Sequence, residues 1–390
     1  MSAGSTFYCY GLFVKPLAAE FEASRLASVL GLTLLILIQG AVAPLVGRAL
    51  DRRPVRGVMT AGALLLAAGL ACASFARELW QVGVVFASAI AVGGYMFGPL
   101  ATATLVARWF VRGRGKALGW TSLGGSLGGV AFPPFVALLV ERHGWRGAAL
   151  ALSGIVLATA IPLSRLVTRP EDLGLQPDGA AGPPASQAPA AATPARELTP
   201  QALLRSRNFW AITASIGLVF APVNMILAHL IPYASDLGIA PTRAATLMSA
   251  YALAGGFGRV GFGSAADRID KRLAIGLACA TFLLGWCALL GQPGFARLLF
   301  ASAVLGLSVG GIMPLWGALV GACFGRAVFG RAIGLMNPMM LPFNLAGAPL
   351  AAWLYDESGS YALALACFLL PPALALLSIS LLRIPEVEPG

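Results

Sequence analysis

Long apolar blocks alternate with short polar segments along the whole chain. We count twelve blocks, and most have the roughly 18 to 28 residues that cross a hydrocarbon core of about 30 Å as a helix. Apolar and polar residues do not alternate within them as they do in barrel strands, so we expect helices. The blocks span residues 1–18, 27–46, 57–75, 80–107, 115–139, 145–166, 208–231, 243–263, 273–291, 295–322, 329–353 and 361–382. The pattern predicts an all-α integral membrane protein with twelve transmembrane helices.

The first block is the weakest of the twelve. Only the stretch from Met1 to Val14 precedes Lys15, which is shorter than the ~20 residues that a spanning helix needs. A secretory signal peptide would have a basic start and a small-residue cleavage site, and neither is evident here. We therefore expect a short first transmembrane helix.

Composition and charge support this interpretation. Hydrophobic residues make up 58% of the chain and charged residues 11%, whereas an average soluble domain has about 25% charged residues. The net charge is +11, which alone would also suit a nucleic-acid-binding protein. However, 19 of the 27 Lys and Arg lie in the loops that are cytoplasmic if the amino terminus is cytoplasmic. The positive-inside rule explains that bias, so we expect both termini in the cytoplasm.

The second half of the chain repeats features of the first half. The segment GRALDRRPVR at 47–56 follows the second block, and GSAADRIDKR at 263–272 follows the eighth with Gly, Asp and Arg at the same spacing. A weaker echo links RGKALG at 114–119 to FGRAIG at 329–334. Between the halves lies a stretch rich in Pro, Ala and Gly, a composition typical of linkers. We predict two pseudo-symmetric six-helix bundles, 1–166 and 207–390, joined by a cytoplasmic linker at 167–206.

Six plus six helices with parallel halves is an architecture of secondary transporters. On the charged turn at 47–56 and its partial copy, the chain resembles the major facilitator superfamily. Within the superfamily it is similar to the monocarboxylate porter and oxalate/formate antiporter group. That similarity is carried by YGLFVKPLAAEF at 10–21, ARWFVRGRGKALG at 107–119, RPEDLGLQPDG at 169–179 and HLIPYASDLG at 229–238.

The expected helix interiors contain one charged side chain that stands out. No Asp or Glu falls in the middle of a block, whereas Arg259 lies in the eighth, within GFGRVG at 256–261. Those letters match a dinucleotide-binding glycine fingerprint, but that motif requires a preceding strand. A charge at membrane depth is usually functional. The alternative is an arginine that reaches the nearby cytoplasmic interface with its long side chain.

The resemblance favours a binding role for this arginine. It implies that Arg259 holds the carboxylate of the substrate, because the related group carries a substrate-binding arginine at this place in helix eight. Guanidinium and carboxylate pair through two parallel hydrogen bonds. The surrounding Gly255, Gly256, Gly258 and Gly261 are then expected to serve close helix packing.

The chain also departs from the related porters in ways that affect mechanism. Where animal monocarboxylate porters usually have an Asp one turn before the arginine and a Lys in helix one, this chain has Gly255 and Tyr8. Oxalate antiporters have a second cation in helix eleven, but no Lys or Arg occurs between Arg331 and Arg383. One cation suits a singly charged carboxylate better than a dianion.

Other polar residues in the blocks are candidates for the substrate cavity. They are Tyr95, Asn224, His229 and Asn337, and each is equally compatible with a hydrogen bond between helices. His229 lies near the outer end of helix seven, where its titration makes it a possible proton site.

The charged turns suggest gating residues. Asp51 with Arg52, and Asp267 with Arg268, lie at expected cytoplasmic helix ends. There an Asp can cap a facing helix and an Arg can bridge carboxylates. The resemblance implies that they latch the outward-open state, and the alternative is that they are topology signals only.

The remaining residue types argue against a metalloenzyme. The chain has six cysteines without a Cys-x-x-Cys pair and two histidines far apart, so we expect no metal site and no cofactor.

We predict a monomeric carrier that moves a small monocarboxylate by alternating access, with a proton or a counter-anion as partner, in a bacterial inner membrane. The alternatives are an exporter of a larger hydrophobic compound and a non-transporting sensor. An enzyme is not expected.

Overall fold

A computed structural model describes residues 7–110, 114–166, 199–265, 268–324 and 328–380. The described residues contain helices joined by turns and short irregular segments, with no strand among them, and the chain forms two compact units, Met1–Ala191 and Ala192–Gly390. The expected bundle and linker bounds stay a prediction, and residues 167–198 of that linker lie outside the described residues.

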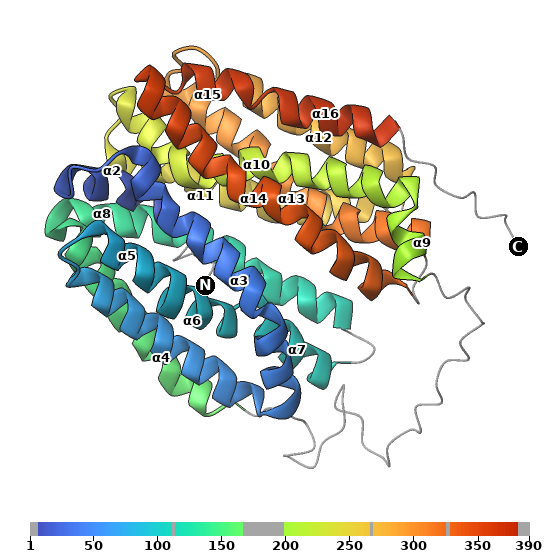
Figure 1. Cartoon of the computed structure of the whole chain (residues 1–390), viewed down its shortest axis with the longest axis horizontal. Coiled ribbons are helices and arrows are strands. Elements are labelled where there is room, and N and C mark those ends of the chain that lie inside the picture. The colour runs from blue at the N-terminus through green and yellow to red at the C-terminus, as the bar shows by residue number, and fades with distance from the viewer. Residues whose placement is uncertain (1–6, 111–113, 167–198, 266–267, 325–327, 381–390) are drawn as a thin grey trace, which may run out of the picture. The chain divides into compact units, whose positions relative to one another are not determined.

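The described part of unit 1 contains eight helical elements, coloured blue to green in Figure 1. They are α2 (Tyr10–Glu20), α3 (Arg25–Arg52), α4 (Val55–Ser74), α5 (Leu79–Val85), the π-helix η1 (Phe86–Ile90), α6 (Ala91–Met96), α7 (Pro99–Trp109) and α8 (Arg114–Ser164). Elements α5 to α7 together occupy the fourth apolar block.

The long helix α8 contains the fifth and sixth apolar blocks. They meet at Gly144, whose φ of 68° and ψ of 173° are not helical. A positive φ is open to glycine because it lacks a Cβ atom. This glycine therefore separates two transmembrane segments without a longer loop.

Among the described residues of unit 2 there are eight helices, coloured yellow-green to red in Figure 1. They are α9 (Pro200–Leu204), α10 (Arg207–Asp236), α11 (Pro241–Ala265), α12 (Lys271–Cys287), α13 (Phe295–Phe324), α14 (Phe329–Ser358), α15 (Ala362–Cys367) and α16 (Leu370–Ser380). The short helix α9 falls within the expected linker, where its Leu203 is fully buried.

The helices confirm the expected all-α membrane fold. In the described part of the chain, seven helical spans are long and apolar enough to cross a membrane. One of them, Gly124–Ser164, covers most of two expected blocks, 115–139 and 145–166. The first helix of the described residues, α2, is short as expected, with 11 residues. Helix α12 is also short, with 17 residues.

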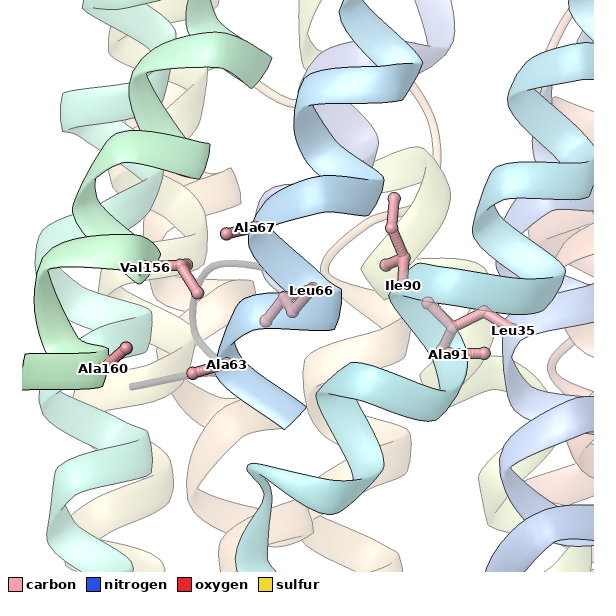
Figure 2. Close-up of a cluster of buried hydrophobic side chains, with 8 residues drawn as sticks. All are labelled: Leu35, Ala63, Leu66, Ala67, Ile90, Ala91, Val156 and Ala160. Atoms are coloured by element: carbon pink, nitrogen blue, oxygen red, sulfur yellow. The ribbon is translucent and has the colours of Figure 1, made fainter. Parts of the chain in front are cut away.

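Small residues bring the helices of unit 1 together. Figure 2 shows α4 between the second segment of α8 on one side and η1 with α6 on the other. Ser153 of α8 donates a hydrogen bond to the carbonyl of Ala67 at 2.7 Å. The cluster consists of Leu35, Ala63, Leu66, Ala67, Ile90, Ala91, Val156 and Ala160. Without water to drive burial, such close packing is what holds helices together inside a bilayer.

Candidate functional site

Arg259 lies on the buried face of α11. Leu253 and Phe257 are exposed on the opposite side of this helix. Because successive helical residues turn by about 100°, Arg259 shares its face with the buried Ala252 and Gly255. The arginine is itself partly buried and lies about 9 Å along the axis from the end of the helix. Its Cβ thus points into the bundle rather than toward the exposed side.

The glycines around Arg259 differ in their surroundings. A methyl group built on Gly258 would lie 2.0 Å from the carbonyl oxygen of Leu307 in α13. One on Gly255 would lie 3.3 Å from the carbonyl oxygen of Gly306. Gly261, in contrast, has nothing within 4 Å and is exposed. The expected packing role therefore holds for Gly255 and Gly258 and is wrong for Gly261.

Asn224 of α10 is tied to α14 by its side chain. Its amide nitrogen donates to Phe220 O at 3.0 Å and to Asn344 Oδ1 at 3.1 Å. Asn344 donates in turn to Met340 O at 3.1 Å. Both protons of the Asn224 amide are used within unit 2. Of the two roles expected for Asn224, in the substrate cavity or in a hydrogen bond between helices, this favours the second. Asn344 escaped the sequence analysis, although it is also an amide within an apolar block.

Asn337 lies two turns before Asn344 on the same helix and is exposed. A position seven residues away falls on nearly the same helix face. The exposed amide of Asn337 and the hydrogen-bonded amide of Asn344 therefore lie on the same face of α14. The candidate role of Asn337 in binding stays a prediction.

His229 is completely buried, and both of its ring nitrogens have partners. Nε2 lies 3.0 Å from Ala348 O and Nδ1 lies 2.9 Å from the Tyr361 hydroxyl. A carbonyl oxygen only accepts, so Nε2 carries a proton. In the neutral ring, Nδ1 then accepts from Tyr361. The Tyr361 ring also packs on Tyr355 and Tyr233, with centroids 4.6 Å and 5.6 Å away.

The candidate tyrosines lie in unit 1. Tyr8 is partly buried in the turn before α2. Tyr95 is partly buried and packs against the cluster formed by the end of α3, the start of α4 and α7. The sequence analysis missed Tyr10, whose buried hydroxyl donates to Ser28 O at 2.7 Å.

A cavity of about 450 Å³ opens in unit 1 between α2, α3 and α5. Its wall is apolar, with Leu30 and Leu34 from α3 and Val84 from α5. The Tyr10 hydroxyl and the Ser28 backbone at its edge already bond to each other. Those described residues that are predicted to bind substrate do not line this cavity.

The expected gating residues are only partly described. Arg52 ends α3 and Arg268 follows α11, and both are exposed. The side chain of Asp51 and all of Asp267 lie outside the described residues. The latch therefore stays a prediction.

A further arginine holds the end of α3. Arg108 of α7 donates through Nη2 to the carbonyl of Leu50 at 2.7 Å. Carbonyls in the last helical turn lack partners within the helix and carry partial negative charge. Arg108 therefore caps the helix that carries the 47–56 turn. The sequence signal for it was its place in ARWFVRGRGKALG.

At the other end of unit 1, three helices meet at Glu20. Its carboxylate accepts from Trp145 Nε1 and from Arg146 Nε, the latter at 3.0 Å. Arg146 Nη1 also donates to Ser74 O in α4 at 2.8 Å. The Trp145 hydrogen bond, opposed by desolvation and assisted by the hydrogen bond and charge of Arg146, lowers the pKa of Glu20 below its usual value. Nothing in the sequence indicated that Glu20 has these partners, because Trp145 and Arg146 lie more than a hundred residues further along the chain.

Metal ligands do not gather in the described residues. No group of three or more His, Cys, Asp or Glu side chains there is close enough to hold an ion.

Comparisons with known proteins agree with one another. A family model described as Major Facilitator Superfamily matches residues 1–232 and 216–390. Monocarboxylate transporter 13 of Bos taurus is 29% identical over 362 residues, which cover 90% of this chain and 79% of that protein. Monocarboxylate transporter 11 of Mus musculus is 30% identical over 365 residues, covering 90% and 77%.

A fungal relative, an MFS-type transporter of Gibberella moniliformis, is 28% identical over 369 residues, which cover 90% of this chain and 81% of that protein. Among solved structures, a bacterial homolog of the human lysosomal transporter Spinster, in an inward-facing and occupied conformation, aligns with a TM-score of 0.66. It is 12% identical and covers 97% of this chain and 93% of its own, so the likeness concerns the fold.

Proposed function

Because this chain belongs to the major facilitator superfamily, in which it resembles the monocarboxylate porters, we propose that it carries a small monocarboxylate anion by alternating access. Membership makes the chain an integral membrane transporter rather than an enzyme. The proposal concerns the substrate and the residues that bind it. In transporters of this architecture the two halves rock around a site at mid-membrane.

The position of Arg259 is the observation that supports the proposal. An arginine stays protonated in proteins, and a cation on the buried face of a transmembrane helix is stabilised by an anion or by a water-filled cavity. Its planar guanidinium matches a carboxylate with two parallel hydrogen bonds. The low dielectric of a membrane interior strengthens such a pair. Arg259 is therefore our proposed anchor for the carboxylate.

The charge inventory favours a monoanion. Helix α14 has no cation after Arg331, so it offers no second anchor at mid-membrane. A dicarboxylate held by one arginine would retain an uncompensated negative charge, which is costly in an apolar surrounding. We therefore expect C1 to C6 monocarboxylates to be preferred over dicarboxylates.

Uptake into proteoliposomes tests the assignment. Radiolabelled monocarboxylates and dicarboxylates are offered to wild type, Arg259→Ala and Arg259→Lys, with equal reconstitution checked on gels. Arg207→Ala is the matched control, because Arg207 is exposed at the start of α10. We expect monocarboxylate uptake in Arg259→Ala to fall to a small remainder that is measurable only at high substrate concentration. Uptake should fall less in Arg259→Lys and stay unchanged in Arg207→Ala. Unchanged uptake in Arg259→Ala would reject the anchor.

Coupling is the second part of the proposal. With no acidic residue in the middle of an apolar block of the sequence, the carrier exchanges one anion for another or moves a proton on the substrate or on His229. The same vesicles, with and without a pH gradient and with and without internal anion, separate these schemes. Flux that depends only on internal anion assigns exchange, and flux that follows the pH gradient assigns proton coupling. A hydrophobic drug transported in place of every acid would instead support the exporter alternative.

Orientation and gating complete the proposal. The excess of Lys and Arg in alternate loops supports cytoplasmic termini in a bacterial inner membrane. Asp51, Arg52, Asp267 and Arg268 are proposed to latch the cytoplasmic side. The orientation is tested with a reporter enzyme that is active only outside the cytoplasm, fused to the carboxyl terminus. We expect no reporter activity, and an active reporter would contradict a cytoplasmic carboxyl terminus.

A further inference from the structure

Helices α11 and α13 touch backbone to backbone. A Cβ atom on Gly306 would lie 2.0 Å from Tyr251 O, and one on Gly310 would lie 2.0 Å from Gly255 O. From the other side, a Cβ on Gly258 would lie 2.0 Å from Leu307 O. Ordinary contact begins at 3.4 Å. These approaches leave no room for a side chain at any of the three positions. The two helices can come this close only because each of these residues is a glycine, which has a hydrogen atom where other residues have a Cβ.

The contacts fall along a single stripe of α11. Tyr251, Gly255 and Gly258 are spaced by four and three residues, which places them on one helix face. The stripe covers about two turns. Contacts spread over two turns fix the rotation of α11 as well as its distance from α13.

Arg259 follows directly after the last of these contacts. One residue beyond Gly258 and four beyond Gly255, its Cβ projects about 100° around the helix from Gly258 and about 40° from Gly255. Any separation or rotation of α11 relative to α13 therefore moves the arginine by a similar amount. A methyl on Gly258 would require Leu307 O to retreat by about 1.4 Å to reach ordinary contact.

Helix α13 is itself anchored within unit 2. Ser308 Oγ donates to Ala278 O of α12 at 2.6 Å. A Cβ on Gly285 of α12 would lie 2.8 Å from the Leu305 side chain of α13. The three helices α11, α12 and α13 thus form one tightly packed group, and α13 cannot easily yield when α11 is pushed.

We propose that Gly258, Gly306 and Gly310 are positioning residues for transport: by letting α11 and α13 meet at their backbones, they set the place and direction of the Arg259 guanidinium. This inference rests on the proposed role of Arg259 as carboxylate anchor. A guanidinium forms two parallel hydrogen bonds with a carboxylate only when both groups are correctly placed. A misplacement of about 1 Å in such a binding group can lower the efficiency of turnover by up to about a hundredfold.

Three single methyl groups on α11 form a graded test. Gly258→Ala meets a backbone oxygen at 2.0 Å, Gly255→Ala meets one at 3.3 Å, and Gly261→Ala meets nothing within 4 Å. We expect the KM for monocarboxylate uptake to rise by roughly tenfold or more in Gly258→Ala, by less in Gly255→Ala, and not at all in Gly261→Ala. Gly261 is nearer to Arg259 in sequence than Gly255 is. A larger effect in Gly255→Ala than in Gly261→Ala therefore indicates that the contact with α13 matters, rather than closeness to Arg259 along the chain.

The same variants separate positioning from folding. Maximal uptake per folded carrier should stay within about twofold of wild type in Gly255→Ala, because a placement effect acts on binding. Equal KM values in Gly255→Ala and Gly261→Ala, with both folded, would overturn the inference even if Gly258→Ala does not fold. A larger change in Gly261→Ala than in Gly255→Ala would overturn it as well.

A double variant shows whether the glycines act through the arginine. If they do, Gly255→Ala adds no further rise in KM to Arg259→Ala, whose remaining uptake is measured at high substrate concentration. Additive effects would overturn the positioning role. If Arg259→Ala alone leaves uptake unchanged, the proposed anchor itself fails, which is a different result.

Discussion

Replacing Arg146 by alanine tests the cluster that joins α2, α4 and α8 in unit 1. The change removes the hydrogen bonds from Arg146 to the Glu20 carboxylate and to Ser74 O. Glu20 keeps its bond from Trp145. The variant therefore loosens the attachment of the short helix α2 without altering any transmembrane contact of the candidate site.

The size of the effect follows from exposure. The side chains of Arg146 and Glu20 are 36% and 39% exposed, so their ion pair contributes only about 0.2 to 1 kcal/mol. The bond to Ser74 O adds about 0.5 to 1.5 kcal/mol. We expect Arg146→Ala to lower the free energy of unfolding by about 1 to 2 kcal/mol.

Thermal unfolding of the purified carrier in mild detergent measures this loss. The matched control is Arg142→Ala, because Arg142 is exposed on the same stretch of α8 and an exposed substitution changes stability by about 0.5 kcal/mol or less. A destabilisation of Arg146→Ala no larger than that of Arg142→Ala would refute the reasoning.

The pH dependence of the stability difference between wild type and Arg146→Ala is a more specific test. The folded protein lowers the pKa of Glu20 below its usual 4.5. A lowered carboxyl pKa stabilises the fold fully above the usual value and ceases to do so as the pH falls through the lowered one. The gap between wild type and Arg146→Ala should be constant from pH 6 to 8 and narrow below about 4.5. A gap of constant size down to pH 3 would show that the Glu20 carboxylate is not involved.

Two further predictions concern partly buried polar contacts between helices. In a double-mutant cycle of Asn224→Ala and Asn344→Ala, unfolding in detergent should show a coupling of about 0.6 to 2 kcal/mol, because the two amides bond directly; purely additive losses would contradict the pair. Arg108→Ala should cost about 1.5 to 3 kcal/mol, since it strips a charged donor from the carbonyl of Leu50. The control Arg53→Ala, at an exposed position, should change stability by less than about 0.5 kcal/mol, and equal losses would argue against the cap.

The apolar blocks were sufficient to predict the helices. A bilayer offers no partner for free backbone groups, so a long apolar stretch has to be helical, and the structure places helices in the twelve predicted blocks. The charged turns and short motifs were sufficient for the superfamily, which the family model confirms. Arg259 was visible because a charge stands out in an apolar block.

The faces and partners of these helices came only from the tertiary structure. In a membrane, both the lipid-facing and the buried sides of a helix are apolar, so periodicity does not tell which side of α11 meets α13. Asn224 and Asn344 are joined by a direct bond although they lie far apart in sequence, and the same holds for Glu20 and Arg146. The difference between Gly258 and Gly261 is of the same kind: both are glycines beside one arginine, and only the position of a neighbouring backbone decides which of them is needed.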